Sequence, residues 1–379
     1  MYEFGYGSRH LGLKDKFCRL SFSYILLIVI LACVGTMTLY SAANGSWDPW
    51  AIKHISRFGV TLLLMVGLAM VDIRYYYHGA YLFYFATLFL LVVVEITGHI
   101  GMGAQRWINL GLFKIQPSEL MKIGMVLFLA RYFSFTTMQN IRTIRGILIP
   151  VVLTIIPVGL ICLQPDLGTA LMLLFTATIM MFVVGVQWWK FALVGAAGAA
   201  LLPIAWNFLH EYQQNRVLTF LDPERDPLGA GYHIIQSKIA FGSGGIFGKG
   251  FLHGTQTHLN FLPEKHTDFI FTMFSEEFGM IGSVMLVLLN ILVIAMGYIF
   301  AFRIRNYFAK LVVIGLNTNY FLYVFINIAM VMGVLPVVGI PLPLISYGGT
   351  VMFSIMSSFG IILCMKVNQD NNINFNEDD

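Results

Sequence analysis

The feature that most constrains this chain is a series of long apolar runs separated by polar segments. A helix needs about 20 mostly apolar residues to cross the roughly 30 Å hydrocarbon core of a bilayer. The sequence predicts ten such helices, at residues 21–41, 54–71, 79–97, 117–133, 144–162, 168–186, 189–209, 269–301, 311–333 and 346–365. The run at 269–301 is longer than one crossing needs, so we expect it to tilt or to project beyond the bilayer. The runs predict an all-α polytopic integral membrane protein and exclude most soluble enzymes.

The composition supports this fold class. Of the 379 residues, 58% are hydrophobic and only 11% are charged, whereas a soluble domain is about 45–50% apolar and about 25% charged. The formal net charge of +4 is too small to indicate a nucleic-acid partner. The cysteines at 18, 33, 162 and 364 show neither a metal-ligand spacing nor a disulfide framework.

The distribution of Lys and Arg predicts the orientation, because cytoplasmic loops carry an excess of both. With the N-terminus inside, the cytoplasmic segments carry Arg9, Lys14, Lys16, Arg19, Arg74, Arg131, Arg142, Arg145, Lys190, Arg303, Arg305, Lys310 and Lys366. The short outer loops carry only Lys53, Arg57, Arg106 and Lys114. We therefore expect one transmembrane domain over 1–379, with cytoplasmic tails at 1–20 and 367–379 and a large extracytoplasmic loop at 210–268.

The most chemically loaded segment is FLPEKHTDFIF at residues 261–271, where the chain re-enters the membrane. Lys265, His266 and Asp268 lie close together in it. A carboxylate at the mouth of an apolar span is partly desolvated and is therefore a stronger base. The alternative, equally supported by the residues, is that Asp268 caps the following helix together with Thr267.

The predicted span at 117–133 carries charges inside it. Glu119 and Lys122 are three residues apart and so share one helix face. Charged residues within a membrane segment are costly and usually line a cavity or pair with one another. The two side chains are therefore candidates for substrate binding, and the alternative is a structural ion pair near the interface.

Two neighbouring segments add polar side chains on the predicted outer side. GAQRWINLG offers Arg106 and Trp107. A guanidinium can hold a phosphate in bidentate fashion, whereas the tryptophan could be only an interfacial anchor. Asp166, in LQPDLGTAL, stands directly before a predicted helix, so N-capping is its leading interpretation.

The long outer loop also has internal structure. Residues 232–240 have apolar positions at helical spacing, which predicts a short amphipathic helix on the membrane surface. Residues 242–250, GSGGIFGKG, predict a flexible or tight turn, since a phosphate loop would need a different glycine spacing and a following Ser or Thr. A pyrophosphate could still approach so bare a backbone. PLPLISYGGT, at 341–350, could be a broken helix that lines a cavity.

These features suit a substrate with an anionic headgroup and a lipid tail. They do not by themselves distinguish an enzyme from a flippase or a channel. Several motifs, however, together resemble those of the SEDS family over about residues 15–367: LDPERDPLGAGYHIIQSKIAFGSGG, GKGFLHGTQ, FLPEKHTDFIF, RWINLG, QPSEL, QPDLGTA and PLPLISYGGT. The string HGTQTHLNFLPEKHTDF and the short N-terminal tail are more similar to the elongation member of the family than to the division member.

The resemblance implies a peptidoglycan glycosyltransferase of the bacterial plasma membrane. Such an enzyme polymerises lipid II, a disaccharide-pentapeptide on undecaprenyl pyrophosphate, into glycan strands during cell elongation and rod-shape maintenance. The resemblance also implies a class B penicillin-binding transpeptidase as the partner, within the elongation complex. The rival functions are a lipid II flippase, a scaffold that activates the transpeptidase, and the division-specific polymerase.

The resemblance places the essential acid of the family at Asp268, which we expect to act as general base. We expect Arg106 and Lys122 to hold the leaving pyrophosphate, with Glu119 orienting Lys122. The full substrate-binding set that we predict is Arg106, Trp107, Glu119, Lys122, Asp166, Lys265 and His266. No cofactor is expected with certainty; a divalent cation could help, but the sequence offers no clear ligand set for it.

Overall fold

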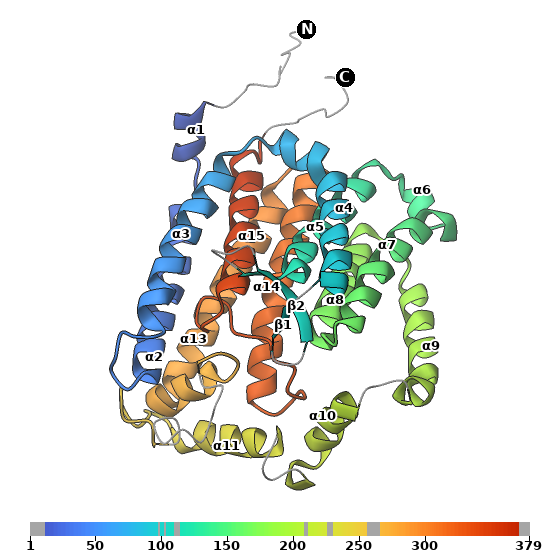
Figure 1. Cartoon of the computed structure of the whole chain (residues 1–379). Helices are drawn as coiled ribbons and strands as arrows, with labels where there is room; N and C mark the ends of the chain where they lie inside the picture. The colour runs from blue at the N-terminus through green and yellow to red at the C-terminus, as the bar shows by residue number, and fades with distance from the viewer. Residues whose placement is uncertain are drawn as a thin grey trace.

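The computed structural model describes residues 12–97, 99–101, 104–109, 114–207, 211–225, 230–255 and 266–370. Long helices pack side by side into one bundle (Figure 1). They are α2 (Phe22–Ala42), α3 (Ala51–Met70), α4 (Ile73–Thr97), α5 (Pro117–Phe135), α7 (Ile144–Leu163), α8 (Leu167–Val184), α9 (Trp188–Trp206), α13 (Ile270–Arg303), α14 (Tyr307–Val331) and α15 (Gly349–Val367). Each of these helices coincides with one of the predicted apolar runs, which confirms a membrane protein that is nearly all helical.

Within the described ranges, eight of these helices are long and apolar enough to cross a membrane. The other two are α5, which carries Glu119, Lys122 and Arg131, and α9, whose apolar stretch covers only Trp188–Leu201. The number of ten crossings therefore stays a prediction.

Short elements join the long helices. Residues 98–116, for which we predicted only a polar outer segment, contain β1 (His99–Gly101), β2 (Ala104–Asn109) and β3 (Lys114–Ile115). These strands form an antiparallel sheet in the order β1-β2-β3. The remaining short elements are α1 (Leu13–Cys18), α6 (Met138–Ile141), α10 (Glu211–Leu221), the 3-10 helix η1 (Pro223–Arg225) and α11 (Ala230–Ser243).

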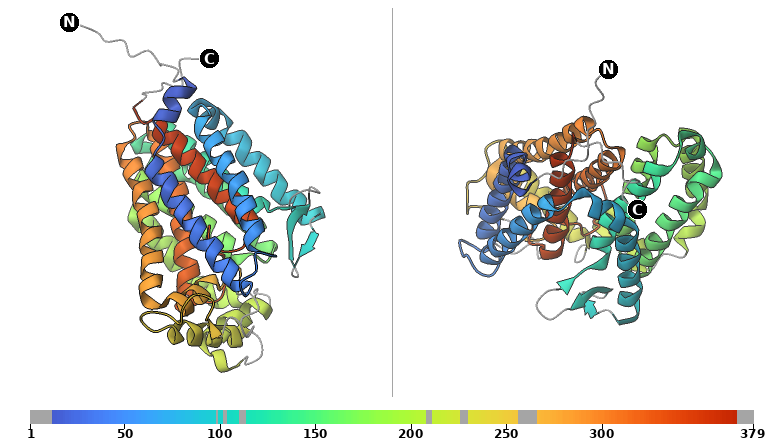
Figure 2. Two further views of the ribbon diagram at one scale, coloured as in Figure 1. Left: turned by 90° about the vertical axis from the view of Figure 1, so that its left-hand side faces the viewer. Right: turned by 90° about the horizontal axis from the view of Figure 1, so that it is seen from above.

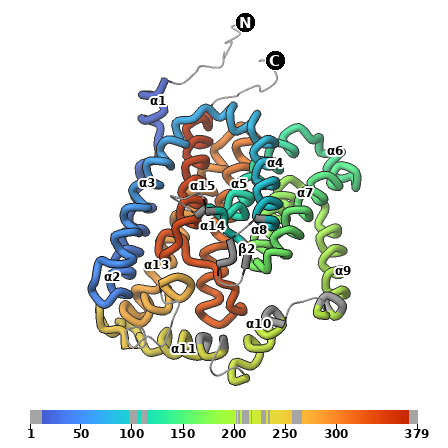
Figure 3. The backbone as a smooth tube through the Cα atoms, in the orientation of Figure 1, coloured from blue at the N-terminus to red at the C-terminus, as the bar shows by residue number. Residues whose placement is uncertain are grey.

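The two ends of the bundle differ. Helix α1 and the last residues of α15 lie at one end, and α10 and α11 cross the opposite end, which we call the α11 end (Figure 1). The chain leaves the bundle at α9, runs through α10 and α11, and returns at α13 (Figure 3). The helix predicted at 232–240 lies within α11. The start of α2 and the end of α15 lie on the same side of the bundle, which agrees with an even number of crossings.

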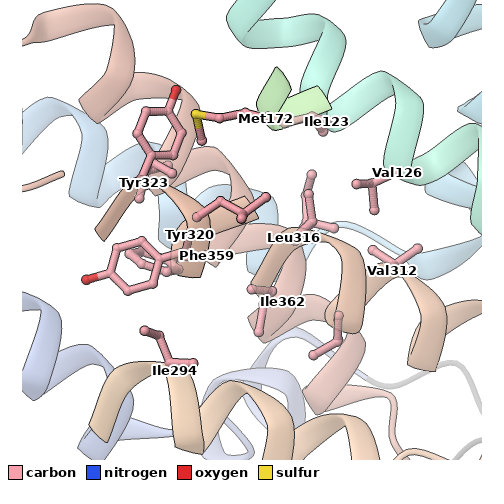
Figure 4. Packing of buried hydrophobic residues seen from close by; sticks show 14 of the residues in the cluster. Ile123, Val126, Met172, Ile294, Val312, Leu316, Tyr320, Tyr323, Phe359 and Ile362 are labelled. Atoms are coloured by element: carbon pink, nitrogen blue, oxygen red, sulfur yellow. The ribbon is translucent and has the colours of Figure 1, made fainter. Parts of the chain in front are cut away.

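Helix α14 contacts four other long helices, α5, α8, α13 and α15, within the bundle that Figure 2 shows from two further sides. Most of its residues are buried, including Leu316 and Tyr320, which Figure 4 shows among other buried side chains. The Tyr320 ring lies edge-on to that of Phe359 of α15. Three polar contacts join it to α13: Asn317 Nδ2 donates to the Ile294 carbonyl at 2.9 Å, Tyr320 OH donates to Asn290 Oδ1 at 2.6 Å, and the hydroxyls of Tyr298 and Thr318 lie 3.0 Å apart. The centre of the membrane fold is therefore partly polar.

Helix α13 covers 34 residues in two sections, and the longer one, after Gly279, has 24 residues and is about 36 Å long at 1.5 Å per residue. This length agrees with the expectation that the run extends beyond a single crossing. The helix is interrupted at Gly279, which has φ 66° and ψ −162°. The interruption separates a first section, Ile270–Phe278, from the long remainder of the helix.

Candidate functional site

Asp268 lies in the turn at the α11 end that leads into α13. The N-cap residue of α13 is Phe269, whose side chain makes no capping hydrogen bond. Asp268 thus stands one residue before the N-cap position that the capping interpretation assigned to it. Its side chain is half-buried, and its Oδ2 atom would lie 3.4 Å from a Cβ atom placed on Gly339. The glycine, at φ 80°, lets the loop between α14 and α15 approach the carboxylate.

Hydrogen bonds from two side chains to backbone carbonyls hold the turn that carries Asp268. The Asn327 amide of α14 donates to the carbonyl of Asp268 at 2.9 Å and to the carbonyl of Ile340 at 2.6 Å. Ser346 Oγ donates to the carbonyl of Thr267 at 2.7 Å. The turn and the loop between α14 and α15 therefore form one connected unit, and the buried Asn327 joins them.

His266 packs among aromatic rings. Its ring stacks on Trp50, with 4.4 Å between ring centroids and 9° between ring planes. Its carbonyl accepts a hydrogen bond of 2.8 Å from the Tyr347 amide. The His266 ring therefore lies beside the aromatic rings of Trp50 and Tyr347. The predicted binding residue Lys265 lies outside the described residues.

Glu119, Lys122 and Tyr323 form a buried triad. Lys122 Nζ lies 2.7 Å from Glu119 Oε1 and also donates to the Tyr323 hydroxyl. Tyr323 OH contacts the two carboxylate oxygens at 2.7 and 2.6 Å, and the ammonium lies 4.2 Å from the centre of the tyrosine ring. Lys122 is 1% exposed and Glu119 is 4% exposed. Because the ammonium is closed off from solvent here, contact with a substrate requires the triad to rearrange.

Arg106 and Asp166 meet at the turn between α7 and α8. Asp166 is the N-cap of α8, and its carboxylate accepts from the Thr169 amide at 3.3 Å and the Thr169 hydroxyl at 3.1 Å. The capping interpretation of Asp166 is therefore correct. Arg106 Nη1 lies 3.9 Å from Asp166 Oδ2, and the guanidinium also donates to the carbonyls of Gln164, at 2.9 Å, and Pro165. The Arg106 side chain remains 30% exposed, so it is far more accessible than Lys122.

Trp107 follows Arg106 on β2 and pairs with His99 in the sheet. Successive side chains of a strand point to opposite faces, so Trp107 and Arg106 do not share one face of β2. The structure leaves the Trp107 side chain half-buried.

The separate clusters converge at the α11 end. Tyr323 and Asn327 are four residues apart on α14, so the triad and the Asp268 turn lie on successive turns of one helix face. A Cβ atom on Gly168, near the start of α8, would overlap with Val338 and lie 3.2 Å from Ile340. The loop that meets Asp268 therefore also meets the helix that Asp166 caps.

Sequence reasoning missed three contributors. Tyr323 and Asn327 belong to an apolar run and carry no local signal of their long-range partners. Arg57, assigned to an outer loop, lies in α3, with its guanidinium 4.7 Å from the centre of the Tyr347 ring. A Cβ atom on Gly349 would lie 3.3 Å from that guanidinium. An arginine so near the start of a span is a signal that could have identified it.

In the part of the chain that the structure describes, no three His, Cys, Asp or Glu side chains gather around one point. The described residues therefore offer no ligand set for a divalent cation. We therefore derive no step through a metal.

Comparisons with known proteins identify the family. Residues 16–371 match the family described as cell cycle protein, FTSW_RODA_SPOVE. The peptidoglycan glycosyltransferase MrdB of Escherichia coli K12 is 42% identical over 346 residues, which cover 91% of this chain and 93% of the relative. The peptidoglycan glycosyltransferase RodA of Treponema pallidum is 31% identical over 92% of this chain and 98% of the relative.

Solved structures agree with these relatives. A chain from a peptidoglycan synthase complex that coordinates polymerization and crosslinking superposes with a TM-score of 0.80 at 32% identity, covering 93% of this chain and 99% of that chain. The rod shape determining protein RodA of Thermus thermophilus superposes with a TM-score of 0.70 at 27% identity, covering 93% of this chain and 98% of that chain. The resemblance drawn from the motifs is thus confirmed, and this chain belongs to the SEDS family of FtsW, RodA and SpoVE proteins.

Proposed function

We propose that this chain is a peptidoglycan glycosyltransferase that polymerises lipid II during cell elongation, with Asp268 as its general base. The observation that carries the proposal is the place of Asp268, a half-buried acid that precedes the N-cap of α13 and faces Gly339 of the loop between α14 and α15. A positioned carboxylate with partial access to water suits proton abstraction. The names of the E. coli and T. pallidum relatives support the reaction class.

The reaction is a displacement at the anomeric carbon of the donor. Asp268 takes the proton from the 4-hydroxyl of the acceptor N-acetylglucosamine. The oxygen then forms a bond to the anomeric carbon of the donor N-acetylmuramic acid, with inversion. The bond to undecaprenyl pyrophosphate breaks, and the pyrophosphate keeps the electron pair.

Cations stabilise the charge that develops on the leaving pyrophosphate. Arg106 is our first candidate, because its side chain is partly exposed, and Asp166, 3.9 Å from Nη1, helps to orient the guanidinium. Lys265 is the second. Lys122 takes part by exchanging the Glu119 carboxylate for a pyrophosphate oxygen, since either anion satisfies its charge. In this proposal Trp107 and His266 present ring faces to the substrate.

The setting follows the distribution of basic residues. We propose that both termini face the cytoplasm and that the α11 end faces the outside of the plasma membrane. A class B penicillin-binding transpeptidase of the elongation complex is the proposed partner. The structural relative from a peptidoglycan synthase complex supports an assembly of this kind.

The test is polymerisation of lipid II by purified protein in detergent. Asp268→Asn removes the base and keeps the size of the side chain, so we expect a folded protein whose turnover falls by roughly 10²–10⁴-fold. Asp222→Asn, at an exposed acid after α10, is the matched control and should leave turnover unchanged. Turnover of Asp268→Asn within a few-fold of wild type would remove Asp268 from the mechanism.

The same assay separates the rival functions. A flippase would form no polymer in detergent, where there is no bilayer to cross, whether or not Asp268 is present. A scaffold would bind its transpeptidase and support wall synthesis in cells even with Asp268→Asn. The division-type alternative shares the chemistry, and complementation of an elongation mutant against a division mutant distinguishes it.

A further inference from the structure

The glycine-rich loop at residues 244–250 does not form an open turn. It lies directly on the interruption of α13. A Cβ atom on Gly244 would overlap with the carbonyl oxygen of Ser275, and one on Gly248 would overlap with that of Glu277. The glycines therefore allow the loop backbone to touch the helix backbone, and α13 covers the backbone that we had considered open to a pyrophosphate.

The loop supplies backbone hydrogen bonds that the interrupted helix lacks. The amides of Lys249 and Gly250 donate to the carbonyls of Glu276 and Glu277, each at 3.0 Å. In return, the Met280 amide donates to Gly245 at 2.9 Å and the Ile281 amide donates to Ile246 at 3.2 Å. Backbone groups near a membrane need such partners, so the loop is an integral part of the helix at this point.

An ion pair strengthens the same junction. Lys249 Nζ lies 2.7 Å from Glu276 Oε1, and the Glu276 side chain is 0% exposed. Thr255 joins them, since its hydroxyl donates to Glu276 Oε1 at 3.2 Å and accepts from Lys249 Nζ at 2.7 Å. Lys249 is therefore the charged partner that compensates a fully buried carboxylate.

The junction and Asp268 lie near the two ends of the first section of α13. Glu276 is eight positions after Asp268, and the helical part between them, from Ile270 to Glu276, is about 9 Å long. Near the other end of this section, Ser237 of α11 contacts the Thr272 hydroxyl at 2.8 Å. Two points of the outer loop thus hold the section of α13 that begins just after Asp268. A tilt of this section would displace the carboxylate.

We propose that Lys249 and Glu276 are positioning residues, which fix the first section of α13 and through it the Asp268 carboxylate; the inference rests on the proposed function of Asp268. It assigns a role in the reaction to the glycine-rich loop, although the loop does not touch the substrate. A displacement of about 1 Å at a reacting group can cost on the order of 10²-fold in rate.

The experiment compares Lys249→Met, Lys249→Arg and Glu276→Gln with the control Lys53→Met, which removes an exposed cation of α3. Lipid II polymerisation gives kcat and KM, and hydrogen exchange at the amides of residues 249, 250, 280 and 281 reports on the junction. We expect Lys249→Met and Glu276→Gln to accelerate exchange and to lower kcat by on the order of 10-fold with KM nearly unchanged. Lys249→Arg keeps the charge and should restore both readouts.

Glu276→Gln keeps a hydrogen-bonding group, so it remains informative if Lys249→Met does not fold. Accelerated exchange with a normal kcat would overturn the positioning role, and so would unchanged exchange in Lys249→Met and Glu276→Gln. The positioning role would also be overturned if kcat fell in Lys249→Met and fell equally in Lys249→Arg. Failure of wild type and Lys53→Met to form polymer would instead refute the proposed function, and the inference would fall with it.

Discussion

In the triad of Glu119, Lys122 and Tyr323, removing one of the two charges should lower the free energy of unfolding more than removing both. Lys122→Met leaves the Glu119 carboxylate, 4% exposed, without its cation. Breaking a buried ion pair in this way costs about 3–5 kcal/mol of folding free energy. Lys122→Met combined with Glu119→Gln leaves no buried charge, and Tyr323 can still bond to the glutamine, so the double variant should lie within roughly 1–2 kcal/mol of wild type.

The assay is unfolding in mixed detergent micelles, paired with lipid II polymerisation. We expect the double variant to regain stability but not activity, because it has no cation to offer the pyrophosphate. Tyr323→Phe is the control: it removes a hydrogen bond to a charged group, worth about 1.5–3 kcal/mol, and keeps Lys122. Recovery of activity together with stability in the double variant would refute substrate binding by Lys122, and a fully stable Lys122→Met would refute the energetic reasoning.

Three further predictions test other parts of the structure. A cysteine at Thr257 should react with a membrane-impermeant reagent applied from outside and one at Thr137 should not; the reverse pattern would invert the proposed orientation. Asn327→Ala removes two hydrogen bonds to loop carbonyls, worth about 1–3 kcal/mol each, and should lower kcat; an unchanged kcat would show that the turn does not need them. Gly248→Ala must accommodate φ 81° and an overlap with the helix backbone, so it should lose more than about 1–2 kcal/mol of unfolding free energy, whereas Gly242→Ala, with open space around it, should lose none.

The helices were predictable because crossing a bilayer requires apolar length, which is a local property of the sequence. The strands at 98–116 were missed, since they are short and lie among polar residues. The interruption of α13 at Gly279 was also missed. Its cause is the approach of a loop about 30 residues earlier in the chain, which hydropathy does not record.

Some features of the candidate site could likewise be predicted from the sequence, and others could not. The pairing of Glu119 with Lys122 and the capping role of Asp166 follow from spacing along the chain, and the structure has both. Tyr323 could not be foreseen as their partner, because 201 residues separate it from Lys122. The structure has Phe269 at the N-cap position of α13, one residue after Asp268, and the sequence alone does not resolve a shift of one residue.

The burial of α14 has a consequence for how the protein is made. A helix that carries Asn317, Asn319 and Asn327 gains little from contact with lipid alone, since polar groups need partners in hydrocarbon. Its hydrogen bonds to α13 form within a hairpin of adjacent helices. Entry of α13 and α14 into the membrane as a pair is therefore favoured over stepwise entry, and a slow translocation of α14 would expose its asparagines to the lipid before the rest of the bundle is assembled.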